Sequence, residues 1–125
     1  AGMQLGAFSL SLNVQDIQAS RAFYEALGFE AFMGEAEQGW LILRNGSCVI
    51  GLFQGMLAQN TFTFNPGWDS EARELPDFTD LRDLQRELQA RGLNPERATN
   101  ENSSGPDYFL LRDPDGNPIL VDQHR

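Results

Sequence analysis

Residues 9–13 read SLSLN and residues 61–65 read TFTFN, so one alternation of small polar and apolar side chains occurs twice in this chain. In an extended chain, successive side chains point to opposite faces. Ser9, Ser11 and Asn13 therefore share one face, and the apolar residues between them share the other. Each stretch is typical of a half-buried β-strand.

The residues after the first stretch predict a helix and then a hairpin. Asp16 can cap a helix that begins at Ile17 and ends at Gly28. Its expected apolar stripe consists of Ile17, Phe23, Tyr24 and Leu27. Two strand-like runs follow, GWLILRNG (39–46) and SCVIGLF (47–53), joined by a tight Asn45–Gly46 turn. A further short strand fits between Glu30 and Met33.

The second stretch is followed by the same elements in the same order. A helix carries Leu81, Leu84 and Leu88 on one stripe and ends at Gly92. YFLLR (108–112) and PILV (118–121) then form a second hairpin around an Asp-Pro-Asp-Gly turn. Four matching elements in order indicate an internal duplication. The second copy also contains a long loop, residues 66–79, in which Trp68 and Phe78 either form a lid or attach the loop to the core.

Two motifs make the chain resemble a known superfamily. FYEALGF (Phe23–Phe29) closes the first helix, and DPDGNPI (Asp113–Ile119) forms the last turn. Together they resemble the vicinal oxygen chelate superfamily, which includes glyoxalases, extradiol dioxygenases and bleomycin resistance proteins. The resemblance implies an α+β fold in which two tandem βαβββ modules form curled mixed sheets around a shared cleft, commonly as a homodimer. We expect a single domain over residues 1–125, with module one at about 7–55 and module two at about 59–125.

The positions that bind metal in that superfamily hold unsuitable residues here. Carried over by motif, they are Ser9, Gly51 (or Ile50), Thr61 and Leu120. Divalent metals need imidazole or carboxylate donors, and the chain has one histidine, His124. We therefore expect no metal and no other cofactor from one chain.

Asp122 and His124 are the candidate catalytic residues. They follow Leu120 at intervals of two, so all three share one side if the last strand extends that far. A carboxylate beside an imidazole can orient it and raise its basicity, as in a general base. The alternative is that the pair lies at a frayed strand end in solvent. Asp113 and Asp115, by contrast, are expected to be turn residues.

The candidate ligand-binding residues lie on the polar faces of the two repeated stretches and in the apolar positions near them. Hydroxyl and amide groups on such a face can orient a neutral polar ligand. The alternative is that this face is simply the hydrated side of an antiparallel sheet. The predicted set is Ser9, Ser11, Asn13, Phe53, Thr61, Thr63, Asn65, Trp68 and Leu120, with Trp40 possible.

Charge and composition narrow the function further. Eighteen acidic and nine basic residues give a net charge of −9, which disfavours nucleic acid and anionic membranes and favours neutral or cationic ligands. The single Cys48 is expected to be a buried thiol. No charged-then-apolar leader opens the sequence, so we expect a cytoplasmic protein.

Three functions remain open. The first is a metal-independent protein that binds a small organic molecule in the cleft, as bleomycin resistance proteins do. The second is a lyase or isomerase that uses Asp122 and His124, or a metal completed across a dimer. The third is an accessory domain whose cleft is filled by its own side chains.

Overall fold

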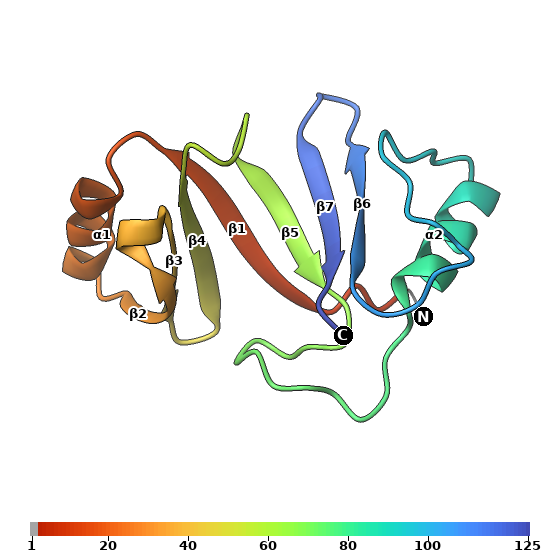
Figure 1. Cartoon of the computed structure of the whole chain (residues 1–125), viewed down its shortest axis with the longest axis horizontal. Helices are drawn as coiled ribbons and strands as arrows, with labels where there is room; N and C mark the ends of the chain where they lie inside the picture. The colour runs from red at the N-terminus through yellow and green to blue at the C-terminus, as the bar shows by residue number, and fades with distance from the viewer. Residues whose placement is uncertain (1–2) are drawn as a thin grey trace. The chain divides into compact units, whose positions relative to one another are not determined.

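A computed structural model describes residues 3–125, and the chain divides into two compact units. One unit comprises Ser9–Thr61. The other comprises Phe62–Arg125 together with the N-terminal stretch that ends at Phe8. Each unit contains one helix and its own set of strands (Figure 1).

The Ser9–Thr61 unit has the predicted βαβββ order. Its elements are β1 (Ala7–Val14), α1 (Ile17–Ala26), β2 (Glu30–Glu35), a short 3-10 helix (Ala36–Gln38), β3 (Trp40–Asn45) and β4 (Cys48–Gln54). The strand order is β2-β3-β4-β1, with β1 parallel to β4 and the other pairs antiparallel. A mixed sheet with its helix between the first two strands confirms the predicted fold class.

Helix α1 covers one face of this sheet. Asp16 caps it, because its carboxylate accepts hydrogen bonds from the N–H groups of Gln18 and Ala19 at 3.1 Å. The buried core consists of Ile17, Leu41, Leu43, Ile50 and Leu52, and Leu10, Leu12, Val14, Tyr24 and Phe29 pack against it.

The predicted apolar stripe of α1 is only half correct. Ile17 is buried and Tyr24 packs on the core, whereas Phe23 is 61% exposed and Leu27 is 58% exposed. One residue corresponds to about 100° of helix rotation, so Phe23 cannot face the sheet together with Tyr24 and Ile17. The helix is apolar on a second face.

The other unit repeats this order of elements, except that one strand is shortened to a single bridge. Its elements are β5 (Thr61–Asn65), α2 (Leu81–Ala90), β6 (Asp107–Arg112) and β7 (Pro118–Gln123), in the strand order β5-β7-β6. Where the first copy has β2, this copy has a single bridge between Arg97 and Leu110. The predicted stripe of Leu81, Leu84 and Leu88 is confirmed, and it packs with Phe109, Val121, Met3 and Leu5.

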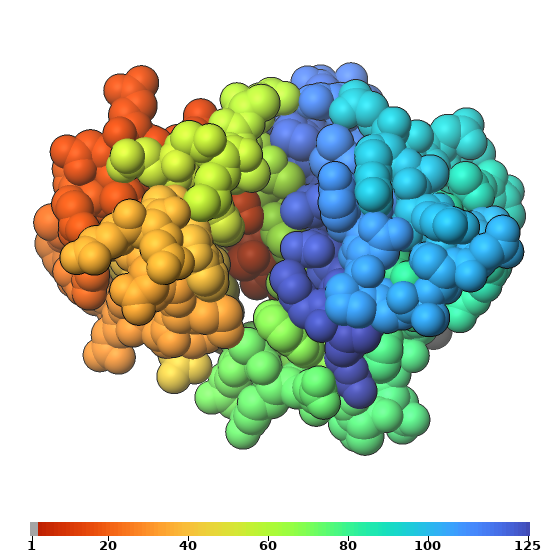
Figure 2. Space-filling model, in the orientation of Figure 1, coloured from red at the N-terminus to blue at the C-terminus, as the bar shows by residue number. Residues whose placement is uncertain are grey.

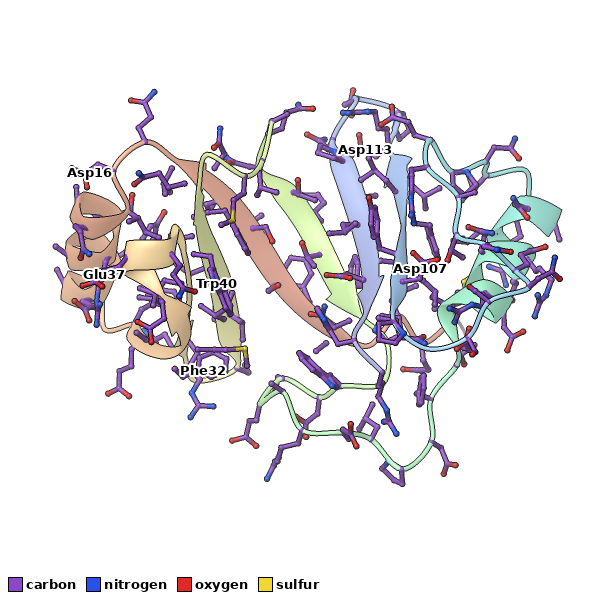
Figure 3. All side chains as sticks on the ribbon, viewed as in Figure 1. Asp16, Phe32, Glu37, Trp40, Asp107 and Asp113 are labelled. Atoms are coloured by element: carbon purple, nitrogen blue, oxygen red, sulfur yellow. The ribbon has the colours of Figure 1, made fainter. Side chains whose placement is uncertain are left out.

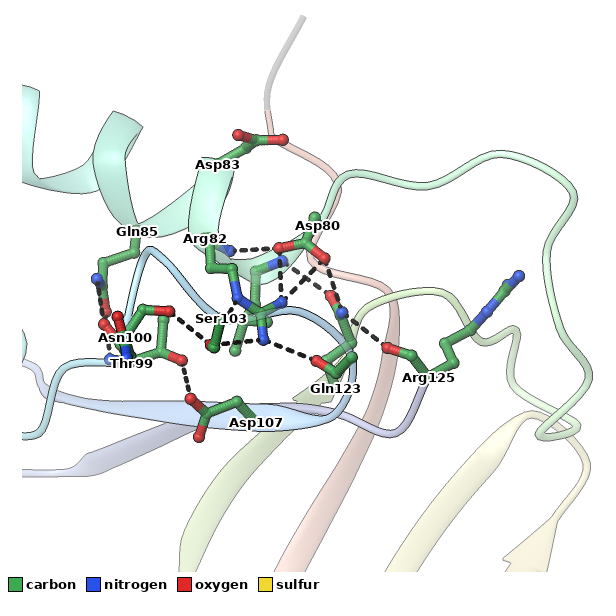
Figure 4. A network of polar contacts seen from close by, with 12 residues as sticks. Asp80, Arg82, Asp83, Gln85, Thr99, Asn100, Ser103, Asp107, Gln123 and Arg125 are labelled. Atoms are coloured by element: carbon green, nitrogen blue, oxygen red, sulfur yellow. Dashed lines mark hydrogen bonds and ion pairs between the residues drawn. The ribbon is translucent and has the colours of Figure 1, made fainter.

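A glutamine joins the last strand of each copy to the start of its helix. The side-chain oxygen of Gln54, at the end of β4, accepts a hydrogen bond from the N–H of Ile17 at 2.8 Å. Gln123, at the end of β7, accepts one from Leu81 N–H at the same distance. Figure 4 shows Gln123 in contact with Asp80 and Arg125 as well. This matching contact supports the internal duplication.

The prediction for Cys48 is wrong, because its thiol is exposed. Cys48 is the first residue of β4 and pairs with Asn45 across the turn, at the end of the sheet. Neither helix in the described part of the chain has the length and apolar character that a membrane span requires.

Candidate ligand-binding site

The helix-free face of strands β5, β7 and β6 carries most of the candidate residues in the second copy. Phe64, Phe109 and Val121 pack toward α2. Strand alternation therefore places their neighbours on the opposite face. Thr63 is paired in register with Leu120, which is paired with Leu110, and Asp122 is paired with Tyr108. Asn65 donates from its side-chain amide to the carbonyl oxygen of Asp122 at 3.0 Å.

Asp122, His124 and Trp68 form a compact cluster at the end of this face. His124 Nε2 lies 3.3 Å from Asp122 Oδ2. The Trp68 ring stacks on the imidazole, with centroids 4.6 Å apart and planes 19° apart. Strand β7 ends at Gln123, so His124 lies one residue beyond it yet still contacts Asp122. The predicted Asp122–His124 pair therefore exists, and Trp68 joins it.

The surroundings of Asp122 raise the pKa of its carboxyl. Burial raises its pKa, the neighbouring His124 opposes that rise, and Asp107 adds to it. Asp122 and His124 side chains keep 32% and 41% of their surface exposed, so both can be reached by a small molecule. The cluster can accept a hydrogen bond, hold a cation or relay a proton between carboxyl and imidazole.

The long loop is attached to this unit at both ends. Trp68 fixes its start through His124. Arg125 fixes the other part, because it donates to the carbonyl oxygens of Gly67 at 3.0 Å and Leu75 at 2.7 Å and lies 4.5 Å above the Phe78 ring. Figure 2 shows residues 66–79 as the green surface at the bottom of the view. These contacts favour attachment over a mobile lid.

A hollow of about 480 Å³ lies beside this loop. Its wall includes an acidic and an aromatic residue of the loop, Asp77 and Phe78, and residues of the N-terminal stretch. The lining residues are Gln4, Gly6, Gly67, Leu75, Asp77, Phe78 and Thr79. The predicted set of binding residues includes none of the residues that line this hollow.

The remaining candidates lie on the helix-free face of the Ser9–Thr61 unit. Ser11 is paired with Gly51, and Asn13 with Phe53. Trp40 is paired with Phe53 and alternates with the core residue Leu41, so it lies on this face and not in the core (Figure 3). Ser11 is 5% exposed. Asn13 is exposed, and Ser9 and Phe53 are half-buried.

The four inferred metal positions do not fit a metal ion. The Thr61 hydroxyl donates to the carbonyl oxygen of Gln59 at 3.0 Å. A side chain at position 51 would begin 2.6 Å from the Phe53 ring. Leu120 is aliphatic, and a serine hydroxyl such as that of Ser9 is a weak donor. Among residues 3–125, no group of three or more His, Cys, Asp or Glu side chains could hold a metal.

Two neighbours of the cluster were missed from the sequence. Tyr108 shares a face with Asp122, and the Arg97 guanidinium lies 3.9 Å above its ring. Strand parity could have placed Tyr108 on this face, but nothing in the sequence links Arg97 to it. Asp113 accepts from the N–H groups of Asp115 and Asn117, as expected of a turn residue, and the Asn117 side chain does most to lower its pKa.

The fold and these faces define a class of α+β proteins built from two βαββ-type repeats. A model of the glyoxalase/bleomycin resistance protein/dioxygenase superfamily matches residues 6–121. The chain therefore belongs to this superfamily. A search of curated proteins finds no significant match.

Solved structures with low sequence identity share the fold. A glyoxalase/bleomycin resistance protein/dioxygenase superfamily member from Vibrio splendidus 12B01 is 16% identical, with 93% of this chain and 97% of that chain covered and a TM-score of 0.62. An NAD-dependent benzaldehyde dehydrogenase from Legionella pneumophila is 10% identical, with 94% and 99% covered and a TM-score of 0.65. A hypothetical protein from Bacillus halodurans C-125 is 12% identical, with 94% and 92% covered and a TM-score of 0.61. Identities this low support the fold alone.

Proposed function

We propose that this protein binds a small organic molecule without a metal, in the manner of the glyoxalase/bleomycin resistance type, and that the ligand is neutral or cationic. The observation that carries the proposal is the cluster of Asp122, His124 and Trp68 on a helix-free face. Within the unit that holds this cluster, the proposed contacts are Thr63, Asn65, Trp68 and Leu120, with Asp122 and His124. Ser9, Ser11, Asn13, Phe53 and Thr61 are the proposed contacts of the Ser9–Thr61 unit.

The chemistry of the cluster supports a cationic or hydrogen-donating ligand. A half-buried carboxylate with a raised pKa gains from a positive partner, because that partner replaces the lost hydration. The Trp68 ring offers an apolar surface that also attracts cations. A net charge of −9 steers cations toward the protein and opposes nucleic acid and anionic membranes.

The proposal also includes the oligomeric state and the compartment: we propose that the protein is a homodimer in the cytoplasm.

A thermal-shift panel tests this function. The probes are cationic glycopeptide antibiotics of the bleomycin type and neutral sugars and amides of small size. A ligand at one hundred times its dissociation constant stabilises a protein by about 2.7 kcal/mol. For a cationic hit we expect Asp122→Asn and Trp68→Ala to reduce affinity about tenfold or more.

Asp115→Asn is the control, because it removes the same charge from an exposed turn. The proposal fails if no probe stabilises the protein. It also fails if Asp122→Asn and Asp115→Asn weaken binding equally, since binding would then depend on net charge alone.

A lyase or isomerase is the second candidate, favoured by the 3.3 Å contact between His124 and Asp122. A general base built from this pair would give a rate that depends on the protonation of both groups. Turnover of a bound hit, lost in both Asp122→Asn and His124→Gln while binding persists in one of them, would favour the enzyme over the binding protein.

A further inference from the structure

Helix α1 exposes an apolar stripe on the side that does not face its sheet. The stripe follows the helical spacing i, i+3, i+4, i+7, i+8, and all of its members are exposed. They are Ala19, Ala22, Phe23, Ala26 and Leu27. Phe23 contacts Tyr24 edge-on, with ring centroids 5.2 Å apart, and still leaves 61% of its surface exposed. A helix whose outer face lay in water would be polar there.

Helix α2 provides an internal comparison. Both helices are ten residues long and follow a capping aspartate, Asp16 or Asp80, so their positions correspond one to one. At the places of Ala19, Ala22, Phe23 and Leu27, the second copy has Asp83, Arg86, Glu87 and Arg91. These four are joined in ion pairs, Arg86 with Asp83 and Arg91 with Glu87.

The two copies of the module therefore differ on the outward face of the helix, where packing onto the sheet does not constrain the residue type. The inward residues Ile17 and Leu81 are apolar in both helices, and the last residues, Ala26 and Ala90, are identical. The outward face changes from paired charges in α2 to a row of alanines with two large apolar side chains in α1. This pattern is typical of a surface that another protein covers.

We propose that the α1 stripe is the surface on which a second copy of this chain docks, with the two α1 helices packed antiparallel about a twofold axis. The inference rests on the proposed homodimer and identifies its interface. Ala19, Ala22 and Ala26 let a second helix approach closely, and Phe23 and Leu27 of each copy fill the space beside those alanines.

The distribution of charge favours a second copy over another partner. Two chains of net charge −9 repel each other, so they associate best through a face without charge, and the stripe carries none. The nearest charged pair on α1 is Arg21 with Glu25, 3.3 Å apart, and Arg21 lies toward the sheet-facing side of the helix, outside the stripe.

Sedimentation equilibrium of the full chain tests this surface. The variant F23E/L27R gives α1 the ion pair that α2 has at the same positions, so the helix should remain folded, as circular dichroism would show. We expect the unmodified protein to dimerise and the variant's dimer dissociation constant to rise at least about 100-fold. The matched control is M56E/L93R, which introduces the same two charges at apolar residues that are each 52% exposed outside α1.

Each outcome decides the inference. A dimer that withstands F23E/L27R, or that M56E/L93R weakens equally, overturns the α1 surface and leaves the homodimer in place. A protein that is monomeric at every concentration overturns both the α1 surface and the homodimer. The thermal-shift panel tests the proposed binding function independently. If F23E/L27R misfolds, A26R against A90R repeats the comparison at corresponding exposed helix ends.

Discussion

The Asp107 carboxylate contributes to the fold through two side-chain hydrogen bonds. The carboxylate accepts a hydrogen bond from the Thr99 hydroxyl (Figure 4). It also accepts one from Arg97 at 2.9 Å. The Thr99 hydroxyl does most to lower the pKa of Asp107, and Arg97 follows. These bonds connect the start of β6 to the segment that precedes it, because both partners lie outside the strand.

Asp107→Asn should lower the free energy of unfolding by about 1–3 kcal/mol at pH 7, the usual value of hydrogen bonds to a charged group. Because the folded-state pKa lies below the unfolded value, the contribution of Asp107 is present above about pH 4 and is lost as pH falls through the folded-state pKa. Urea unfolding between pH 3 and pH 7 measures this difference.

Asp115→Asn controls for the loss of one negative charge. A difference between Asp107→Asn and the unmodified protein that persists unchanged at pH 3 would contradict the assigned role of the Asp107 carboxylate.

Single residues show where sequence patterns stop being informative. Strand parity placed Asp122 and Leu120 on one side of the last strand, and the Asp-Pro-Asp-Gly pattern predicted the turn role of Asp113. Such patterns could not show that Cys48 is exposed, because an apolar run does not say which of its residues lies at the exposed end of the strand. The helical pattern also could not show that Phe23 is exposed. A helix with apolar residues on two faces has the same sequence pattern as a helix that is buried on both faces.

At the level of elements, the contact between each last strand and its helix can be tested in both copies. Gln123 is 1% exposed and also donates to Asp80 and to the carbonyl oxygen of Arg125. Gln54 is exposed, although it makes the same bond to the first N–H of its helix. The same contact therefore occurs in a buried and in a hydrated setting.

Gln123→Ala should lower the free energy of unfolding by about 2–4 kcal/mol, because it leaves buried polar groups without a partner and opens a cavity. Gln54→Ala should cost about 0.5–1.5 kcal/mol, because water can replace the lost bond. Chemical denaturation of both variants measures the two values. Equal losses would contradict the role of burial in this contact.

Most elements could be predicted from the sequence. The alternation in SLSLN and TFTFN, the capping Asp16 and the turns at Gly46 and Gly116 are local signals, and the corresponding elements are confirmed. The two glutamine contacts could not be predicted, since they join residues 37 and 42 positions apart and no periodicity marks them. The same holds for Arg125, which binds loop carbonyls 50 and 58 positions away.

For the whole molecule, the duplication explains what is shared and what has diverged. Both copies keep the helix cap, the inward apolar residues and the glutamine contact. They differ in the outward face of the helix, in the reduced strand at Arg97 and in the loop of residues 66–79. The features that differ are those available for function, whereas the shared ones maintain each unit.

The absence of suitable donors at Ser9, Gly51, Thr61 and Leu120 was visible in the sequence, and the structure adds a steric reason at Gly51. Superfamily membership alone would not reveal this, because it does not specify which residues occupy these four positions. Binding without a metal is therefore the central claim about the molecule.

Titration calorimetry of a thermal-shift hit tests that claim most directly, with the protein measured after EDTA treatment and again after incubation with Zn²⁺, Ni²⁺ or Fe²⁺. We predict the same dissociation constant in every case and only traces of transition metal by elemental analysis. Near-stoichiometric metal in the purified protein, or binding that disappears with EDTA and returns with one of these ions, would contradict it.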